Sequence, residues 1–382
     1  MTRLAALLLS SALSLPAMAS DLRATGDLGV IVERATGSVL IVDQSEHAAI
    51  GRIEGLGDLS HASLVFSPDE RFAYLFGRDG GLTKIDILAQ TVVNRVIQGG
   101  NSIGGAISDD GRLVAVANYE PGGVKIFDAD TLELVADIPA EGKALGLEDA
   151  PGRRFVFSVW DTNETRIVDM SGPEPEVTVL PEIGTNPYDA LITDDGRTYI
   201  AGLFGEDGLS AIDLWEEPPV ARRILPGYGR GQVEMPVYKM PHLEGWAKAG
   251  EQIVLPAVHH AEVLWVDSRT LEETGRTATH GQPVFAMARP GGRQVWVNFA
   301  HPKNDTIQVI DSMSHEITGE LKPGPAVLHM EFTSRGTEAW VSVRDDNKVV
   351  IYDTTTLQQI GEIAAESPSG IFFTARAHRL GL

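Results

Sequence analysis

The chain has 382 residues, of which 43% are hydrophobic and 7% aromatic, and a formal net charge of −22. An acidic chain lacks the basic face that nucleic acid or anionic lipid requires, so we expect neither as a partner. The sequence has no cysteine, which excludes disulfides, a thiolate nucleophile, cysteine-ligated zinc, iron–sulfur clusters and covalent c-type haem attachment.

The first 19 residues are typical of a secretory signal peptide. Arg3 supplies the positive start, residues 4–9 begin a short apolar stretch, and Ala17-Met18-Ala19 fits the small-residue cleavage pattern. This stretch is too short to span a bilayer of roughly 30 Å, and no other segment is long and apolar enough. We expect a signal peptide over residues 1–19, a mature chain that starts near Ser20, and a soluble protein in a bacterial periplasm.

A repeat of about forty residues runs through the rest of the chain. Each copy has a tight turn followed by an apolar, β-rich run, and then a second run that ends in Asp. The turns lie at residues 67–71, 108–112, 193–197 and 289–293, with looser copies at 150–153 and 334–336. The second runs end at Asp86, Asp128, Asp169, Asp213, Asp267, Asp311 and Asp353. This period, with several short strands in each copy, is typical of a β-propeller.

The repeat predicts eight blades. Seven complete copies cover residues 61–99, 102–140, 145–183, 187–227, 241–281, 283–324 and 326–366. Residues 26–55 supply three strands without an inner one, and residues 369–375 supply a single strand. Together these two ends make one more blade, and its closure removes the exposed sheet edges. We therefore predict an all-β fold: one eight-bladed propeller over residues 20–382, closed by the C-terminal strand joining the N-terminal blade.

Histidines concentrate at one face of the predicted propeller. The loops that lead into the inner strands and the loops between second and third strands share a face, at the mouth of the central channel. Seven of the ten histidines fall near it: His61, His242, His259, His260, His280, His301 and His329. A purely structural role for any single one is the alternative. His47, His315 and His378 lie elsewhere.

The loops between second and third strands also carry Arg78, Asn118, Tyr119, Phe204 and Arg344. Guanidinium groups form paired bonds to carboxylates, aromatic rings cover a planar face, and a neutral imidazole ligates iron. The set suits a flat, carboxylate-bearing ligand. Alternatively, Arg78 and Arg344 form rim ion pairs with the Asp that follows each. No sequence pattern supports dedicated hydrolase chemistry, and the long connection over residues 227–240 is interpreted as a rim or lid.

Seven stretches are more specific than the blade repeat: residues 57–63, 76–81, 99–105, 118–123, 201–208, 238–246 and 367–372. In these stretches the chain resembles the periplasmic haem d1 biosynthesis propellers encoded in nitrite-reductase (denitrification) gene clusters, the family of the cluster's F protein. The resemblance covers nearly the whole mature chain. It implies that the protein binds haem d1 or a late precursor in the channel mouth and takes part in haem d1 biosynthesis for the dissimilatory nitrite reductase.

That family is similar in turn to the haem d1 domain of cytochrome cd1 nitrite reductase, an eight-bladed propeller. His61, followed by Gly77-Arg78-Asp79, matches the axial histidine ahead of a Gly-Arg-Asp turn, so the resemblance implies that His61 ligates the iron. His242 matches a distal active-site histidine. A second distal histidine would fall near Gly205-Glu206, where this chain has none, and there is no c-type haem domain. We therefore do not expect nitrite reduction itself.

Three hypotheses follow. In the first, a tetrapyrrole-modifying enzyme uses His61, His242 and Arg78 in catalysis. Its cofactor-binding residues are His61, Arg78, Asn118, Tyr119, Phe204, His242, His301, His329 and Arg344. In the second, a non-catalytic carrier or chaperone hands haem d1 to partner enzymes. In the third, the propeller is a scaffold for protein partners. The first two imply other haem d1 biosynthesis proteins and nitrite reductase as partners, and a homodimer is left open.

Overall fold

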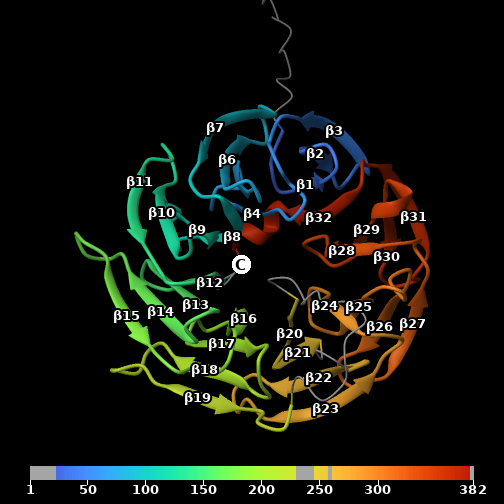
Figure 1. The fold of residues 1–382 in the computed structure, drawn as a ribbon. Helices are drawn as coiled ribbons and strands as arrows, with labels where there is room; N and C mark the ends of the chain where they lie inside the picture. Colours follow the sequence, from blue (N-terminus) through green and yellow to red (C-terminus); the bar gives the residue numbers. More distant parts are fainter. Residues whose placement is uncertain (1–22, 229–244, 257–259, 379–382) are drawn as a thin grey trace, which may run out of the picture.

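The computed structural model describes residues 23–228, 245–256 and 260–378. Eight four-stranded antiparallel sheets stand as blades around a central channel (Figure 1). The prediction of an all-β, eight-bladed propeller is confirmed. The expected signal peptide, His242 and His259 lie outside the described residues. No helix among the described residues is long and apolar enough to cross a membrane.

The strands of the first four blades follow the chain, except that blade 1 takes its inner strand from the C-terminus. Blade 1 contains β1 (Leu28–Glu33), β2 (Ser38–Asp43), β3 (Ala48–Ile53) and β32 (Pro368–Phe373). Blade 2 contains β4 (Ser63–Phe66), β5 (Phe72–Phe76), β6 (Gly81–Asp86) and β7 (Thr91–Ile97). Blade 3 contains β8 (Asn101–Ile107), β9 (Leu113–Glu120), β10 (Val124–Asp128) and β11 (Leu134–Ile138). Blade 4 contains β12 (Ala144–Ala150), β13 (Arg154–Val159), β14 (Glu164–Asp169) and β15 (Glu176–Leu180).

The other four blades repeat this order from the channel outward. Blade 5 contains β16 (Pro187–Ile192), β17 (Thr198–Leu203), β18 (Leu209–Asp213) and β19 (Ala221–Ile224). Blade 6 contains β20 (Ala247–Ala249), β21 (Gln252–Pro256), β22 (Glu262–Asp267) and β23 (Glu273–Ala278). Blade 7 contains β24 (Pro283–Ala288), β25 (Gln294–Phe299), β26 (Ile307–Asp311) and β27 (Ile317–Leu321). Blade 8 contains β28 (Val327–Phe332), β29 (Glu338–Val343), β30 (Lys348–Asp353) and β31 (Gln359–Ala364). Two short 3₁₀ helices, η1 (Arg344–Asp346) and η2 (Thr374–His378), complete the described elements.

The C-terminal strand closes the ring as predicted. Strand β32 pairs antiparallel with β1, with Val30 opposite Phe372 and Ile31 opposite Ile371. In Figure 1 the red β32 lies beside the blue β1. The pairing leaves neither β1 nor β32 as a free sheet edge on that side, which is how a closed ring avoids edge-to-edge association.

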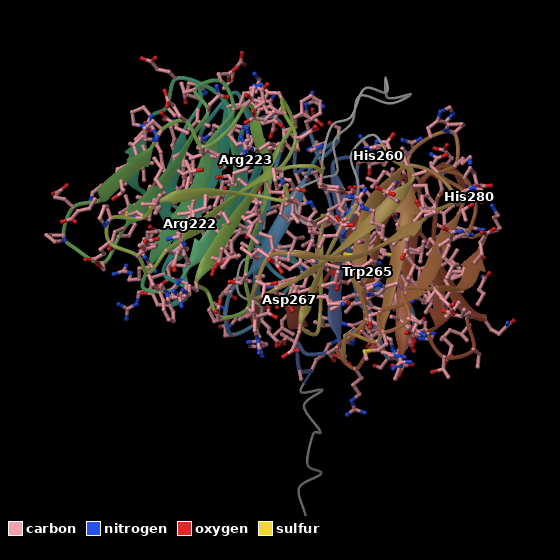
Figure 2. The ribbon with its side chains drawn as sticks, turned by 90° about the horizontal axis from the view of Figure 1, so that it is seen from below. Arg222, Arg223, His260, Trp265, Asp267 and His280 are labelled. Atoms are coloured by element: carbon pink, nitrogen blue, oxygen red, sulfur yellow. The ribbon has the colours of Figure 1, made fainter. Side chains whose placement is uncertain are left out.

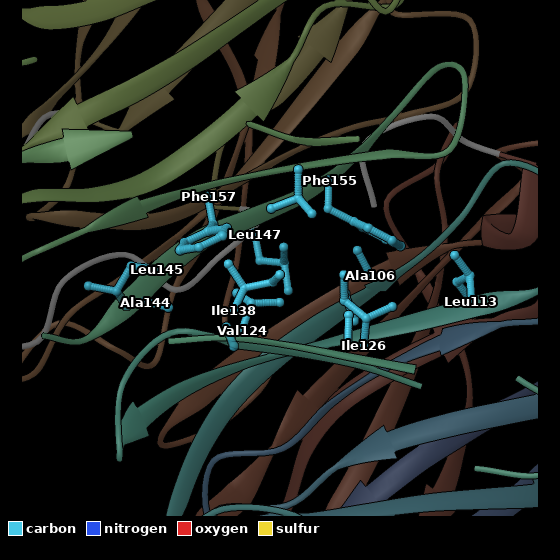
Figure 3. Close-up of a cluster of buried hydrophobic side chains, with 14 of the residues drawn as sticks. Ala106, Leu113, Val124, Ile126, Ile138, Ala144, Leu145, Leu147, Phe155 and Phe157 are labelled. Atoms are coloured by element: carbon cyan, nitrogen blue, oxygen red, sulfur yellow. The ribbon is translucent and has the colours of Figure 1, made fainter. Parts of the chain in front are cut away.

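Apolar side chains fill the gap between each pair of neighbouring blades. Eight buried clusters occupy the eight interfaces around the ring. Between blades 3 and 4, Val124 and Ile126 pack with Leu145, Phe155 and Phe157 (Figure 3). Burial of such side chains is the main favourable contribution to the folded state, at roughly 1.5–3 kcal/mol for each large one.

The two repeated sequence features bind each other. In blades 2, 5 and 7 the Arg of the turn pairs with the Asp that ends the third strand, at 2.8 Å for Arg71–Asp86, 2.6 Å for Arg197–Asp213 and 2.7 Å for Arg293–Asp311. The same Asp accepts backbone hydrogen bonds from the turn that follows it, as Asp86 does from the N–H groups of Leu88 and Ala89. These contacts account for the occurrence of a turn Arg and a strand-ending Asp in the same copy of the repeat.

Asp86 therefore has a pKa below its ordinary value of 3.8. Burial alone would raise the pKa, but the hydrogen bond from Ala89 and the Arg71 guanidinium outweigh burial. A carboxylate with a lowered pKa stabilises the fold fully above its unfolded pKa, and that contribution is lost as the pH falls through the folded pKa.

We predict that Asp86→Asn lowers the free energy of unfolding at pH 7 by about 1–2 kcal/mol, because the amide keeps one acceptor but loses the charge. The deficit should narrow below about pH 4, where the wild-type carboxylate is itself protonated. Denaturant unfolding at pH 7 and pH 3 measures both. The exposed Glu46→Gln variant is the control and should match wild type. An equal deficit at both pH values would contradict the linkage.

Candidate functional site

The loops expected at the channel mouth do share one face. His260, in the β21–β22 loop, and His280, ahead of β24, lie toward one end of the blades in Figure 2. Asp267, which ends β22, lies toward the other end, with Trp265 between. The strand-ending Asp residues and their Arg partners therefore lie at one face of the ring. The loops that carry His260 and His280 lie at the opposite face.

A cavity of about 380 Å³ opens on the histidine-bearing face. Blades 7, 8, 1 and 2 supply most of its wall. Four residues of the predicted site border it: His61, His301, His329 and Arg344. The structure adds Arg34, Asn298 and a set of aromatic side chains that includes Phe285, Phe299 and Phe372.

A β-bulge at the start of the inner strand shapes this wall. The register between inner and second strand shifts between Pro283 and Ala286 in blade 7 and between Val327 and Met330 in blade 8. The pairing of β1 with β32 shifts at the matching position, beside Gly370. A bulge bends the strand and re-aims one side chain. Phe285, His329 and Gly370 occupy the bulged positions and all border the cavity.

His61 lies in the loop directly before β4, half-buried at the cavity wall. The loop is held to the Gly-Arg-Asp turn, because the backbone N–H of Arg78 donates to the carbonyl of Asp58 at 2.8 Å. Within the loop, the N–H of Ser60 donates to the Asp58 carboxylate at 2.8 Å. The loop that carries His61 and the Gly-Arg-Asp turn are thus in direct backbone contact through Asp58 and Arg78.

Arg34, which borders the same cavity as His61, lies within electrostatic range of two further arginines, Arg344 and Arg78. Partial burial and the charge of Arg344 lower the pKa of Arg34, Asp58 opposes them, and Arg78 lowers it further. Hydrogen bonds from Ser60 hold the pKa of Asp58 below its ordinary value, although burial opposes them, and Arg78 and Arg34 add to the effect. Like charges are costly to gather, so Arg34, Arg78 and Arg344 form a site suited to anions.

The alternative role for Arg78 and Arg344, an ion pair with the Asp that follows each, holds for one of them only. Arg344 does pair with Asp345, at 2.7 Å. Asp79 instead binds Arg95, at 2.6 Å, and Arg78 is exposed at the rim. Arg78 is therefore the more available of the two for a ligand carboxylate.

His329 is the most deeply buried histidine of the cavity, at 6% exposure. Burial lowers its pKa to about 3, and the charge of Arg376 contributes in the same direction. Its ring meets Phe285 edge-on at 5.3 Å and lies at a tilt to Phe372 at 5.6 Å. His301, in contrast, is exposed at the rim. His329 is neutral at physiological pH.

Tyr119 and Phe204 lie apart from the cavity wall, in an aromatic group on blades 3 to 5. Trp160 contacts Tyr188 at 5.7 Å and Phe204 at 5.2 Å between ring centroids. Tyr119 and Tyr188 share a hydrogen bond, and burial raises the pKa of both phenols. The charge of Arg78 lowers the pKa of Tyr119 in opposition to burial, which places this group within electrostatic reach of the arginines.

Asn118 does not join the ligand-facing set. Its side chain is fully buried and forms a reciprocal amide pair with Gln98, at 2.9 and 3.0 Å. Both polar ends of the Asn118 amide are therefore engaged within the protein. In this structure Asn118 joins the second strand of blade 3 to the segment that connects blades 2 and 3.

Arg34 is the site residue that sequence reasoning missed. It follows β1, the second strand of blade 1, and so occupies the same position as Arg78 in blade 2 and Arg344 in blade 8. Aligning the N-terminal strands with the second and third strands of the other blades could have found it.

No three His, Asp or Glu side chains converge as a metal site among the described residues. An iron held inside a macrocycle needs only an axial ligand from the protein, and a neutral imidazole supplies one. His61 can fill this role.

Comparison with known proteins decides the family. The family model described as the cytochrome D1 heme domain matches residues 23–377. The chain belongs to this family. Two curated relatives bear the name Protein NirF, from Stutzerimonas stutzeri (60% identical over 94% of this chain and 95% of the relative) and from Pseudomonas aeruginosa (58% identical over 94% of each). The expected kinship with the F protein is confirmed.

A solved structure gives the same architecture. It is described as the dihydro-heme d1 dehydrogenase NirN in complex with DHE. The two chains are 27% identical and superpose with a TM-score of 0.80. The match covers 94% of this chain and 77% of the NirN chain. The family and this neighbour support a role related to haem d1.

Proposed function

We propose that the protein binds haem d1 or a late precursor in this cavity and takes part in haem d1 biosynthesis for the dissimilatory nitrite reductase. The single observation that carries the proposal is that His61, Arg34 and Arg344 border one aromatic-walled cavity, with the charge of Arg78 close enough to act on Arg34. The related NirN structure, solved with DHE, supports a ligand of this kind.

The residues fit a flat, carboxylate-bearing macrocycle. His61 would ligate the iron, and Arg34, Arg78 and Arg344 would bind carboxylates. Phe285, Phe299 and Phe372 would cover apolar parts of the ring. When bound, the macrocycle supplies a redox-active iron and a conjugated ring system.

The charge distribution favours the same ligand. The chain as a whole carries a net charge of −22, whereas Arg34, Arg78 and Arg344 lie close enough together for their charges to act on Arg34. A cleft lined by one sign of charge raises the local concentration of ligands of the opposite sign. A tetrapyrrole with several carboxylates is drawn to these arginines rather than to the acidic remainder.

Two roles share this binding site. An enzyme would use His61, His242 and Arg78 on the macrocycle, with His242 as distal acid or base. A carrier would bind the macrocycle unchanged and transfer it to other haem d1 biosynthesis proteins or to nitrite reductase. We propose that either role is carried out in the periplasm, because residues 1–19 have the pattern of an export signal.

The binding prediction is tested by mixing the purified protein with haem d1 or its immediate precursor and following the absorption spectrum over time. We expect a shifted spectrum with wild type and with His378→Ala, a histidine at the opposite face. We expect the shift to be lost or altered with His61→Ala, because the axial imidazole is gone. A new chromophore that develops with time indicates an enzyme, and a stable shifted spectrum indicates a carrier. A free-ligand spectrum with wild type would refute both.

The carboxylate site generates a second prediction. Arg34→Gln should weaken tetrapyrrole binding about tenfold, the cost of one charge-assisted hydrogen bond, and should reduce the salt dependence of binding. Titrations at low and high ionic strength measure both effects. Arg269→Gln is the matched control, because Arg269 is exposed and pairs with Glu251 at the other face. Equal affinities of the Arg34→Gln and Arg269→Gln variants for the tetrapyrrole would show that Arg34 does not contribute to binding.

A further inference from the structure

We infer that His329 is a fixed hydrogen-bond donor to an oxygen atom of the bound macrocycle, and not a second ligand of its iron. The inference rests on the proposed function, and it assigns a recognition role within the same cavity. Its chemical target is a carbonyl or carboxylate oxygen at the edge of the ring system.

The tautomer of His329 follows from one backbone contact. The N–H of Ile371, in the closing strand β32, donates to Nδ1 of His329 at 3.2 Å. A backbone N–H is always a donor, so Nδ1 must supply a lone pair. A neutral imidazole has one protonated nitrogen, and here that nitrogen is Nε2.

The ring stays neutral because its surroundings disfavour a second proton. His329 is buried, and Arg376 places a positive charge nearby. Arg376 reaches from η2 to the Glu331 carboxylate at 2.5 Å and lies 5.2 Å from the ring centre of Phe372. The charge is thus held in position by a buried ion pair on the same strand as His329.

The orientation of His329 is fixed from three sides. Its backbone N–H donates to the hydroxyl of Ser342 at 2.8 Å, and that hydroxyl donates back to the His329 carbonyl at 3.1 Å. These two hydrogen bonds with Ser342 lie in the bulge of β28, where the His329 side chain is turned toward the cavity. Phe285 and Phe372 flank the ring, so rotation would cost both packing and the Ile371 bond.

The ring nitrogen of His329 that remains available to a ligand, Nε2, is therefore a hydrogen-bond donor and has no lone pair to offer. Within residues 23–228, 245–256 and 260–378, no group accepts a hydrogen bond from Nε2, and the residue borders the cavity. Iron requires a nitrogen lone pair, which the protonated Nε2 does not offer. A ligand oxygen satisfies the Nε2–H group, and leaving that group without an acceptor in the complex would be unfavourable.

The tautomer is tested first, on ligand-free protein, by ¹⁵N NMR of the imidazole nitrogens. The His329 signals are assigned by their loss in His329→Gln. We expect an unprotonated Nδ1 and a protonated Nε2, unchanged between pH 8 and pH 5. A proton on Nδ1, or titration within this range, would overturn the inference whatever the protein binds.

The donor role is tested with two variants in haem d1 titrations. Glutamine can place an amide N–H where Nε2–H stands, whereas leucine has similar bulk and no donor. We expect His329→Gln to bind within about threefold of wild type and His329→Leu about tenfold more weakly, as for loss of one hydrogen bond. The electron paramagnetic resonance spectrum of the bound iron should be the same in wild type and His329→Gln.

Two results would overturn the donor role: equal affinity of the Gln and Leu variants, or an altered iron spectrum in His329→Gln, which would mean that the imidazole is a ligand. Failure of wild type to bind haem d1 at all would refute the proposed function instead. The ¹⁵N measurement is independent of that failure.

Discussion

The pairing of β32 with β1 is the constraint on which the rest of the structure depends. It converts seven blades and two incomplete ends into a closed ring, so that every blade has two neighbours to bury its apolar faces. The same strand supplies Gly370 and Phe372 to the cavity wall and the N–H of Ile371 to His329. The strand that closes the ring therefore also builds part of the site, whereas the chain ends beyond it meet at the opposite face, where the Thr374 hydroxyl donates to the Thr25 carbonyl.

One face of the ring carries contacts that stabilise the blades, and the other face carries the cavity proposed to bind the ligand. On one face, Arg–Asp pairs join the turn to the third strand in blades 2, 5 and 7, and the strand-ending Asp also accepts backbone hydrogen bonds, as Asp86 does. On the other face, loops of different composition bring His61, Arg34 and Arg344 to one cavity. Because the repeated contacts hold the blades at the far face, the loops at the mouth are free to differ. An asymmetric site can form on a nearly symmetric ring in this way.

Much of this could be predicted from the sequence, because a propeller's repeat is local. Turn residues, strand-ending Asp residues and strand lengths fix the blade count, the closure and the face of each loop. This is why His61, His301, His329 and Arg344 were expected on one face, and all four border the cavity.

The remaining features depend on contacts between distant parts of the chain. Arg34 belongs to a blade that is assembled from both termini, so its equivalence to Arg78 is hidden in the linear order. Asp79 pairs with Arg95 and not with its neighbour Arg78, and Asn118 is paired with Gln98. The tautomer of His329 depends on a backbone group 42 residues away. No local pattern announces such choices.

The most direct test is an experimental structure of the protein with haem d1 bound. The account predicts the iron at bonding distance from His61, carboxylates at Arg34, Arg78 and Arg344, and an oxygen of the macrocycle within hydrogen-bond distance of His329 Nε2. It is contradicted if the macrocycle occupies the second cavity, of about 330 Å³ beside η2 at the opposite face, or if His61 makes no contact with the iron.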